Sequence, residues 1–235
     1  MSQDPAGLDT TQRLLMAASE VFADVGYRAA TLREICRRAH ANIAAVNYHF
    51  HDKEQLYLAV VRQAVAGAGE GLALLAPDPA DPPEDKLRRF IREFLHNLLG
   101  ADRPVQLLRL LAHETVEPTP GLDMVAEEAA RPVSDIVNGI VAELLGPAAD
   151  PAAVRDCTVS VLSQCANYHH SEAMVQRLDH MNVHDAATIE HFADHVFRFS
   201  LGGIQALADA GKPRGATAGL SSSARTRVVR AKTKE

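Results

Sequence analysis

Apolar residues recur every three or four positions along most of the chain, whereas the strict alternation typical of strands is scarce. This spacing predicts four helices before residue 76. The first is capped by Thr10 or Thr11 and stopped by Gly26, and short helices follow Thr31 and Asn42. A long one opens at the capping box that Asp52 begins and runs to about Leu75. Further helices are expected at about 84–99, 103–116, 121–146, 152–180 and 185–210. The predicted fold class is all-α.

Prolines and glycines divide this helical pattern. Four prolines in seven residues, between Pro77 and Pro83, exclude a continuous helix there. Pro132 falls inside the predicted 121–146 helix and should break or kink it. From Lys212 onwards small and basic residues replace the apolar pattern, and such a segment buries too little surface to order itself. We therefore expect domains at 1–54 and 55–211 and a disordered basic tail at 212–235.

Charge is distributed unevenly along the 235 residues, whose net charge is -6. Residues 1–63 carry seven basic and seven acidic side chains. Residues 64–211 carry ten basic and 22 acidic ones, whereas residues 212–235 carry seven basic ones and one acid. An acidic middle repels nucleic acid. Contact with DNA would therefore fall to the N-terminal segment or the tail.

Several classes of protein do not fit the composition. No apolar run reaches the length of a membrane helix, so no membrane partner is expected. The N-terminus lacks a basic-then-apolar signal pattern, which predicts a cytoplasmic location. Three cysteines without CxxC spacing predict buried thiols rather than disulfides or a zinc site. No cofactor is expected.

The segment TLREICRRAHANIAAVNYHFHDKE, residues 31–54, is the most informative one. It places two short helices on either side of the link His40-Ala41-Asn42, a spacing that suits a helix-turn-helix. Small residues, Ala44 and Ala45, would let the second helix approach base edges, and asparagine is well shaped to read adenine. A plain helical hairpin with a polar surface would show the same pattern.

Residues 11–63 resemble the N-terminal domain of the TetR family of bacterial transcriptional regulators. The resemblance rests on Leu15, Ala18, Phe22, Gly26, Thr31, Ile35, Ala39, the run Asn47-Tyr48-His49-Phe50, Lys53-Glu54 and Leu56. The chain departs from the family at His40, where glycine is usual, and at Asn47, where tyrosine is usual. The phrase ANIAAVNYHF and the stretches 107–123 and 161–178 are similar to the CecR-type branch.

The resemblance implies a ligand-responsive repressor that binds an inverted-repeat, double-stranded operator as a homodimer. Its N-terminal domain would be a three-helix helix-turn-helix unit, and its larger C-terminal domain would bind a small-molecule effector and dimerise. The candidate DNA-binding residues are Thr31, Arg33, Asn42, Ala44, Ala45, Asn47, Tyr48, His49 and Lys53. Within this set we assign base reading to Asn42, Ala44, Ala45 and Asn47, and phosphate contacts to Thr31, Tyr48, His49 and Lys53.

The C-terminal half supplies two further groups of candidates. Helices between 103 and 180 should surround an effector pocket, with the candidate lining Leu107, Leu111, Glu114, Met124, Ile140, Leu162, Cys165, Tyr168 and His169. The last helix is apolar on more than one face, as a helix buried by its own core and by a partner would be. Its candidate dimer face is Ile189, Phe192, Val196, Phe199 and Gly203; a central core helix would look similar.

The histidines of the C-terminal half and Glu114 each allow another interpretation. His191 and His195 stand four positions apart with His184 upstream, a spacing that suits a metal sensor or metal-dependent enzyme. No HExxH motif completes such a site, and solvated histidines are the simpler explanation, so no metal and no catalytic residue is assigned. Glu114, in an apolar run, could anchor a ligand in the pocket or form a salt bridge with Arg109.

Overall fold

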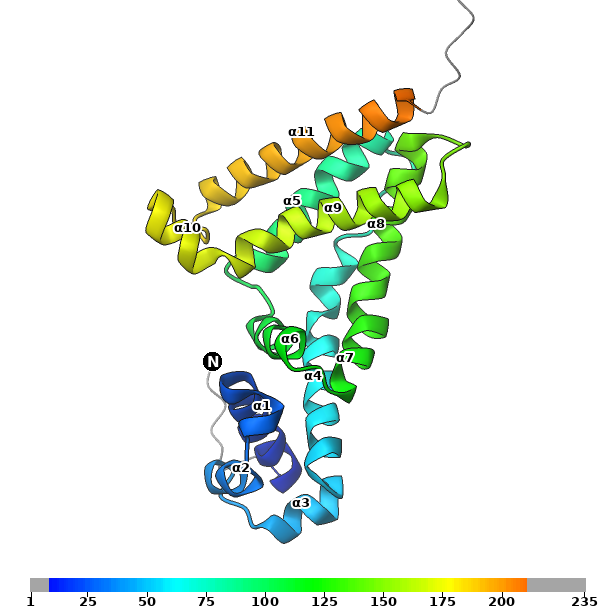
Figure 1. Cartoon of the computed structure of the whole chain (residues 1–235). Coiled ribbons are helices and arrows are strands. Elements are labelled where there is room, and N and C mark those ends of the chain that lie inside the picture. Colours follow the sequence, from blue (N-terminus) through cyan, green and yellow to red (C-terminus); the bar gives the residue numbers. More distant parts are fainter. Residues whose placement is uncertain (1–8, 211–235) are drawn as a thin grey trace, which may run out of the picture.

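The structure is a computed structural model that describes residues 9–210, and the predicted tail at 212–235 lies outside them. Every regular element in that range is helical (Figure 1). The helices are α1 (Thr10–Ala29), α2 (Leu32–Arg38), α3 (Ile43–Phe50), α4 (Lys53–Ala73), α5 (Pro83–Leu99), α6 (Val105–Val116), α7 (Pro120–Val125), the π-helix η2 (Ala126–Ala130), α8 (Arg131–Leu145), α9 (Pro151–His170), α10 (Glu172–Asp179) and α11 (Ala186–Ala210). The all-α prediction is confirmed.

Two hydrophobic cores organise these helices. The first joins α1, α2 and α3 to α4, α6 and α7 around Phe22 and Tyr57, both almost fully buried. The second joins α5, α8, α9 and α11 around Phe90 and Val196. Figure 1 shows α4 rising from the small N-terminal group of helices towards the second core. The first core extends along α4 to Ala68, beyond the boundary expected at residue 54.

Three element boundaries differ from the prediction. Asp9, not Thr10 or Thr11, caps α1, and its side chain accepts from the Gln12 amide. Gly26 takes a positive φ of 76° as expected of a stop signal, yet the helix resumes and ends at Ala29. The predicted 152–180 helix is two helices, α9 and α10, which meet at Ser171.

The predicted 121–146 helix is continuous but contains an irregular turn. It comprises α7, η2 and α8, and Pro132 stands in the first turn of α8. The irregularity expected at Pro132 appears as the π-helical turn η2 directly before α8, and the backbone remains helical across it. Among the described residues no helix is long and apolar enough to cross a membrane.

Candidate nucleic-acid interface and ligand cavity

Side-chain caps fix the start of each helix in the helix-turn-helix. The Thr31 hydroxyl accepts from the Glu34 amide at 3.2 Å, and Asn42 Oδ1 accepts from the Ala45 amide at 2.9 Å. Asp52 Oδ1 does the same for Gln55 at 2.8 Å. Each bond satisfies an amide that has no partner within its helix. These local signals explain why the short helices begin where the sequence predicts.

The turn between α2 and α3 explains one departure from the family pattern. His40 has φ of 49°, in the left-handed region that glycine adopts most easily. The family's usual glycine fits this backbone, and histidine adopts it here. Ala41 returns its amide to the Cys36 carbonyl at 3.0 Å, which closes the turn.

Helix α3 has one buried and one exposed face. Val46 and Phe50 insert into the first core, whereas Ala44, Asn47 and Tyr48 face solvent. Tyr48 is 81% exposed. Asn47 therefore stands on the accessible face of the helix, as predicted. An exposed face with a small residue beside a polar amide is what a major-groove reader requires.

Two of the predicted base readers are placed differently. Ala45 is half-buried and packs against the first core, because the rotation of α3 turns it partly towards that core. Asn42 is exposed, but its amide oxygen already caps α3, which leaves only its N–H donors for DNA. The exposed face of α3 thus includes Ile43, Ala44 and Asn47.

The predicted phosphate anchors are held by contacts with α1. The His49 ring shares a hydrogen bond of 3.2 Å with the Thr11 hydroxyl. Lys53 Nζ lies 4.6 Å from the centre of the Tyr27 ring and donates to the Arg28 carbonyl at 3.4 Å. Burial lowers the pKa of Lys53. Both side chains are thereby oriented by α1, and Thr31 and Tyr48 are exposed.

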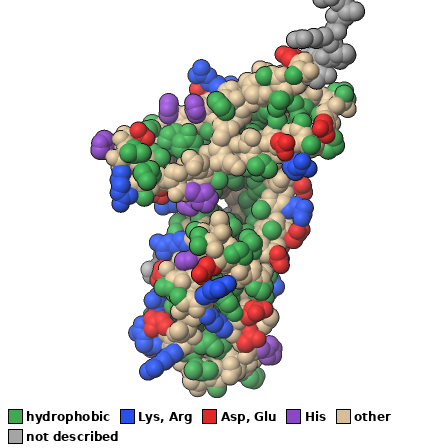
Figure 2. Space-filling model, viewed as in Figure 1, with side chains coloured by type: hydrophobic (Ala, Val, Ile, Leu, Met, Phe, Trp, Pro, Cys, Tyr) green, Lys and Arg blue, Asp and Glu red, His purple; other side chains and the backbone are tan. Residues whose placement is uncertain are grey.

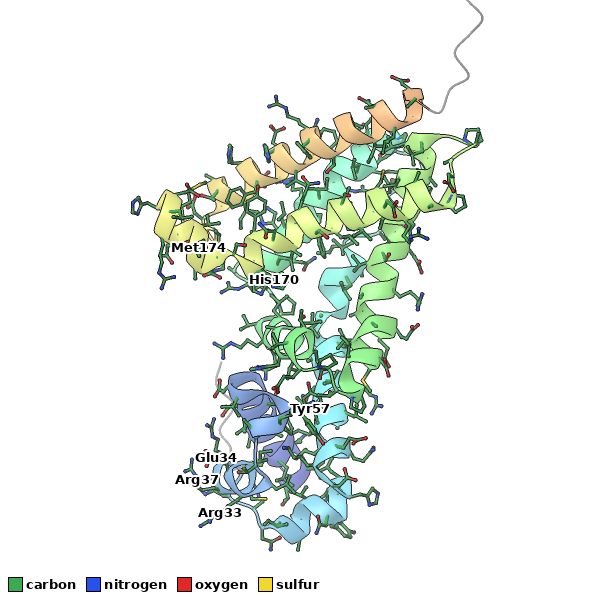
Figure 3. The ribbon with its side chains drawn as sticks, viewed as in Figure 1. Arg33, Glu34, Arg37, Tyr57, His170 and Met174 are labelled. Atoms are coloured by element: carbon green, nitrogen blue, oxygen red, sulfur yellow. The ribbon has the colours of Figure 1, made fainter. Side chains whose placement is uncertain are left out.

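Helix α2 carries a charge network that the sequence did not indicate. Glu34 accepts from Arg37 at 2.7 and 2.8 Å and from Arg38 at 2.9 Å (Figure 3). These hydrogen bonds lower the pKa of Glu34 to about 2. Arg33 is exposed and makes no ion pair within the described part of the chain. It is therefore the α2 guanidinium available to a phosphate.

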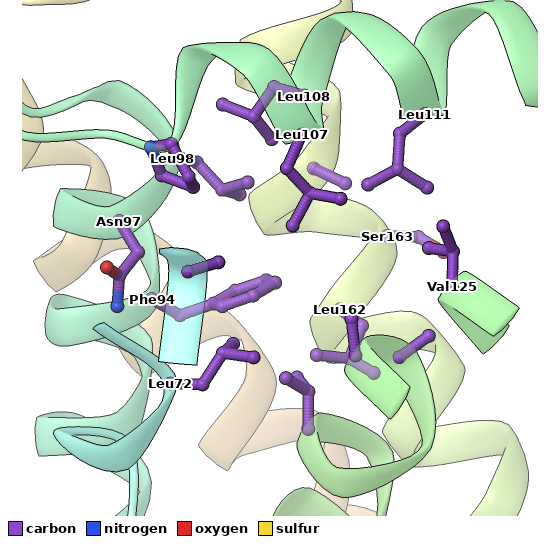
Figure 4. A pocket seen from close by; sticks show the side chains of 16 residues that line it. Leu72, Phe94, Asn97, Leu98, Leu107, Leu108, Leu111, Val125, Leu162 and Ser163 are labelled. Carbon is purple, nitrogen blue, oxygen red and sulfur yellow. The ribbon is translucent and has the colours of Figure 1, made fainter. Parts of the chain in front are cut away.

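A cavity of about 310 Å³ lies where α4, α5, α6, α8 and α9 meet, between the two cores (Figure 4). Its wall is almost entirely apolar and includes three predicted lining residues, Leu107, Leu111 and Leu162. The other lining residues are Ala68, Leu72, Phe94, Asn97, Leu98, Pro104, Leu108, Val125, Ala129, Ala130, Val133, Ser163 and Ala166. The contributions of α4 and α5 were missed because they depend on how the helices pack.

The remaining pocket candidates do not line this cavity. Ile140 and Cys165 are buried in the second core, and Met124 packs against the first. Tyr168 stacks on Phe192 with ring centres 3.8 Å apart, which turns it towards α11. His169 lies on a neighbouring hollow described below. The buried state expected of the three thiols is confirmed.

Glu114 neither lines the cavity nor pairs with Arg109, whose guanidinium contacts Asp24 at 3.3 Å instead. Its carboxylate is 1% exposed and accepts three hydrogen bonds. Tyr57 Oη and Thr119 Oγ1 each donate to Oε1 at 2.5 Å, and the Thr119 amide donates to Oε2 at 2.8 Å. Burial, reinforced by this carboxylate, raises the pKa of Tyr57. The network ties α4 to the α6–α7 junction.

The structure corrects the predicted dimer face on α11. Ile189, Phe192 and Val196 are at most 5% exposed because they pack into the second core, so they cannot contact a partner. Phe199 is 66% exposed and Gly203 is also at the surface. The accessible part of the predicted face is therefore its C-terminal end.

The histidines do not assemble into a metal site in the part of the chain that the structure describes. No group of three or more His, Cys, Asp or Glu side chains there could hold a metal ion. His184 bonds to Glu172, and His191 and His195 are exposed on α11. The metal-site interpretation therefore gains no support.

Comparison with known proteins covers both halves of the chain. Residues 83–204 match the C-terminal domain of the HTH-type transcriptional dual regulator CecR, and residues 14–60 match the bacterial regulatory proteins of the tetR family. CecR of Shigella flexneri is 31% identical over 149 residues, 60% of this chain and 66% of the relative. The transcriptional activator FasR of Mycolicibacterium smegmatis is 45% identical over 60 residues, 26% of this chain and 27% of the relative. The matches thus span less than two thirds of these relatives.

Solved structures agree on the fold. A TetR-family regulator from Streptomyces coelicolor superposes with a TM-score of 0.59 at 18% identity, covering 83% of this chain and 96% of that one. The flavonoid-responsive regulator FrrA gives a TM-score of 0.58, also at 18% identity and with the same coverage.

Proposed function

The chain belongs to the TetR family of bacterial regulatory proteins, with a C-terminal domain of the CecR type, and we propose that it is a ligand-responsive repressor that binds an inverted-repeat operator as a homodimer. The observation that carries the proposal is the exposed face of α3, where Ala44, Asn47 and Tyr48 stand clear of the core. This face would enter the major groove. Arg33 and Lys53 would contact the phosphates on either side.

A second copy is needed because one recognition helix reads only a few base pairs. We place the partner on the exposed apolar residues of α9 and α11: Val159, Phe199 and Leu207 are 56%, 66% and 53% exposed. Phe199 and Leu207 line a shallow hollow together with Ser160, Gly203 and their neighbours. An isologous pair of such surfaces would bury these side chains and set two recognition helices about one helical turn of DNA apart.

Ligand response is the third part of the proposal. The apolar cavity lies between the core of the DNA-binding helices and the core of α5, α8, α9 and α11. A ligand there would favour one relative position of the two cores over another. DNA affinity falls if the favoured position no longer matches the groove spacing. Leu111→Trp should fill the cavity and blunt the response without abolishing DNA binding.

The test is selection of bound DNA from a random pool by the full-length protein, together with sedimentation of the free protein. We expect a selected site with a dyad, and a dimer at micromolar concentration. Selected DNA without a dyad, or a protein that stays monomeric, would reject the proposal. A chromosomal site overlapping a promoter, with transcription rising in a deletion strain, would identify a repressor; falling transcription would identify an activator.

A further inference from the structure

A hollow of about 200 Å³, distinct from the one between α9 and α11, adjoins the apolar cavity and shares Leu108 with its wall. In this subsection, the hollow means this space. Along α9, Leu162 and Ala166 line the cavity, and His169 lines the hollow. Positions four and three residues apart lie on one face of a helix, so this face runs from one space to the other. The hollow therefore continues the cavity by about one helical turn.

The walls of the two spaces differ in chemistry. No charged side chain lines the cavity, and Asn97 and Ser163 are its only polar side chains among the described residues. Four of the six residues that line the hollow are titratable: Arg103, Arg109, His169 and Glu172. A single ligand that occupied both spaces would thus have an apolar body and a polar end.

The charge of that polar end follows from the hydrogen bonds of His184. One of its ring nitrogens lies 2.8 Å from the Leu99 carbonyl oxygen, and the other lies 2.9 Å from Oε1 of Glu172. Glu172 is therefore engaged by His184, and it makes no ion pair with either arginine among the described residues. Two guanidinium groups, Arg103 and Arg109, thus stand beside one carboxylate among the residues that line the hollow.

Two side chains of the hollow lack part of the partners that they could have. Arg103 donates to the Gly100 carbonyl at 3.1 Å but makes no ion pair within the described residues. His169 Nδ1 is buried without a hydrogen-bond partner. Desolvation lowers the pKa of His169, so its ring is neutral near pH 7 and one nitrogen donates. A buried polar atom without a partner is costly unless a ligand satisfies it.

We propose that the cavity and the hollow form one site for an amphiphilic anion, whose chain lies among the leucines and whose carboxylate binds Arg103 and His169. The inference rests on the proposed ligand response and adds the chemical class of the ligand. Arg109 is the outer cation of the site, since it is 58% exposed and already contacts Asp24. Glu172 also lines this end of the site, where one of its oxygens contacts the His184 ring at 2.9 Å.

The experiment compares three amphiphiles with the same chain, namely decanoate, 1-decanol and decyltrimethylammonium, by calorimetric titration of the full-length protein. A charge-assisted hydrogen bond predicts that decanoate binds roughly tenfold to hundredfold more tightly than decanol. Arg103→Gln should lower the affinity for decanoate to that for decanol, while decanol binding stays unchanged. Arg103→Lys should retain the preference for decanoate over decanol. Arg155→Gln, an exposed charge at the opposite end of α9, is the matched control and should leave the preference intact.

Equal binding of decanoate and decanol, tighter binding of the cation, or no binding of any of the three would overturn the inference. Unchanged preference in Arg103→Gln would also overturn it. DNA binding by the same preparations separates this inference from the proposed function. A protein that selects a dyad but ignores decanoate refutes the ligand class alone, whereas one without sequence-specific DNA binding refutes the regulator.

Discussion

Replacing Tyr57 by phenylalanine removes one donor from the buried Glu114 carboxylate and leaves the ring in place. The hydroxyl donates at 2.5 Å to an oxygen of a side chain that is 1% exposed. A hydrogen bond to a charged group contributes about 1.5–3 kcal/mol, and no water can replace it easily at a buried site. We therefore expect Tyr57→Phe to lower the free energy of unfolding by about that amount.

The assay is urea denaturation followed by circular dichroism, with thermal melting beside it. For a chain of this length, each kcal/mol shifts Tm by about 2–4 °C. Tyr27→Phe is the matched control, because Tyr27 packs against Phe22 and Tyr57 in the same cluster. Tyr27→Phe should lower the free energy of unfolding much less than Tyr57→Phe does. Equal losses for the two variants would show that the Glu114 network contributes nothing beyond ring packing.

The pKa of Tyr57 supplies a second readout of the same network. Burial and the nearby carboxylate raise it, so its contribution is fully present below the unfolded pKa of about 10 and is lost as the pH rises further. The wild type should therefore lose stability above pH 10 more steeply than Tyr57→Phe. Parallel alkaline profiles would contradict the raised pKa.

Three further predictions concern single residues. The Glu34 carboxyl should titrate in NMR with a midpoint of about pH 2. Its stabilising contribution is therefore present above pH 4.5 and is lost as the pH falls towards 2. Arg37→Gln should raise this midpoint, because it removes hydrogen bonds to the carboxylate. Gly67→Ala should raise the free energy of unfolding, measured in urea, by about 0.5–1 kcal/mol, because Gly67 is helical and faces open space. Gly71→Ala is the control and should give no such gain, because its Cβ would overlap Asn97 Oδ1. His51 has φ of 70° and ψ of -54° in a strained turn, so His51→Gly should leave stability unchanged or raise it by up to about 2 kcal/mol, and a loss in thermal melting would refute the strain.

The helix-turn-helix was largely predictable because its signals are local. Thr31, Asn42 and Asp52 each cap a helix through an amide three residues away, and that spacing is visible in the sequence. The buried positions Val46 and Phe50 follow from helical periodicity once the start of α3 is known. The half-buried state of Ala45 did not follow, because it depends on the rotation of α3 against the first core.

The C-terminal half was less predictable because its features depend on distant contacts. Leu107 and Cys165 are both buried apolar residues, yet one lines the cavity and the other fills the second core. The buried face of α11 was mistaken for a dimer face since apolar periodicity does not say which element covers it. The partners of Glu114 include Tyr57, 57 residues away, and no sequence spacing indicated that bond.

The most direct test of the account measures the affinity of wild type and Asn47→Ala for the selected DNA site and for random DNA at one salt concentration. Asn47 stands on the exposed face of α3 and makes no hydrogen bond that its loss would break among the described side chains. We predict a loss of about 1–3 kcal/mol on the selected site, relaxed preference at one base pair in each half-site, and unchanged affinity for random DNA. An equal loss on both DNAs, or none on either, would show that α3 does not read bases in the orientation inferred here.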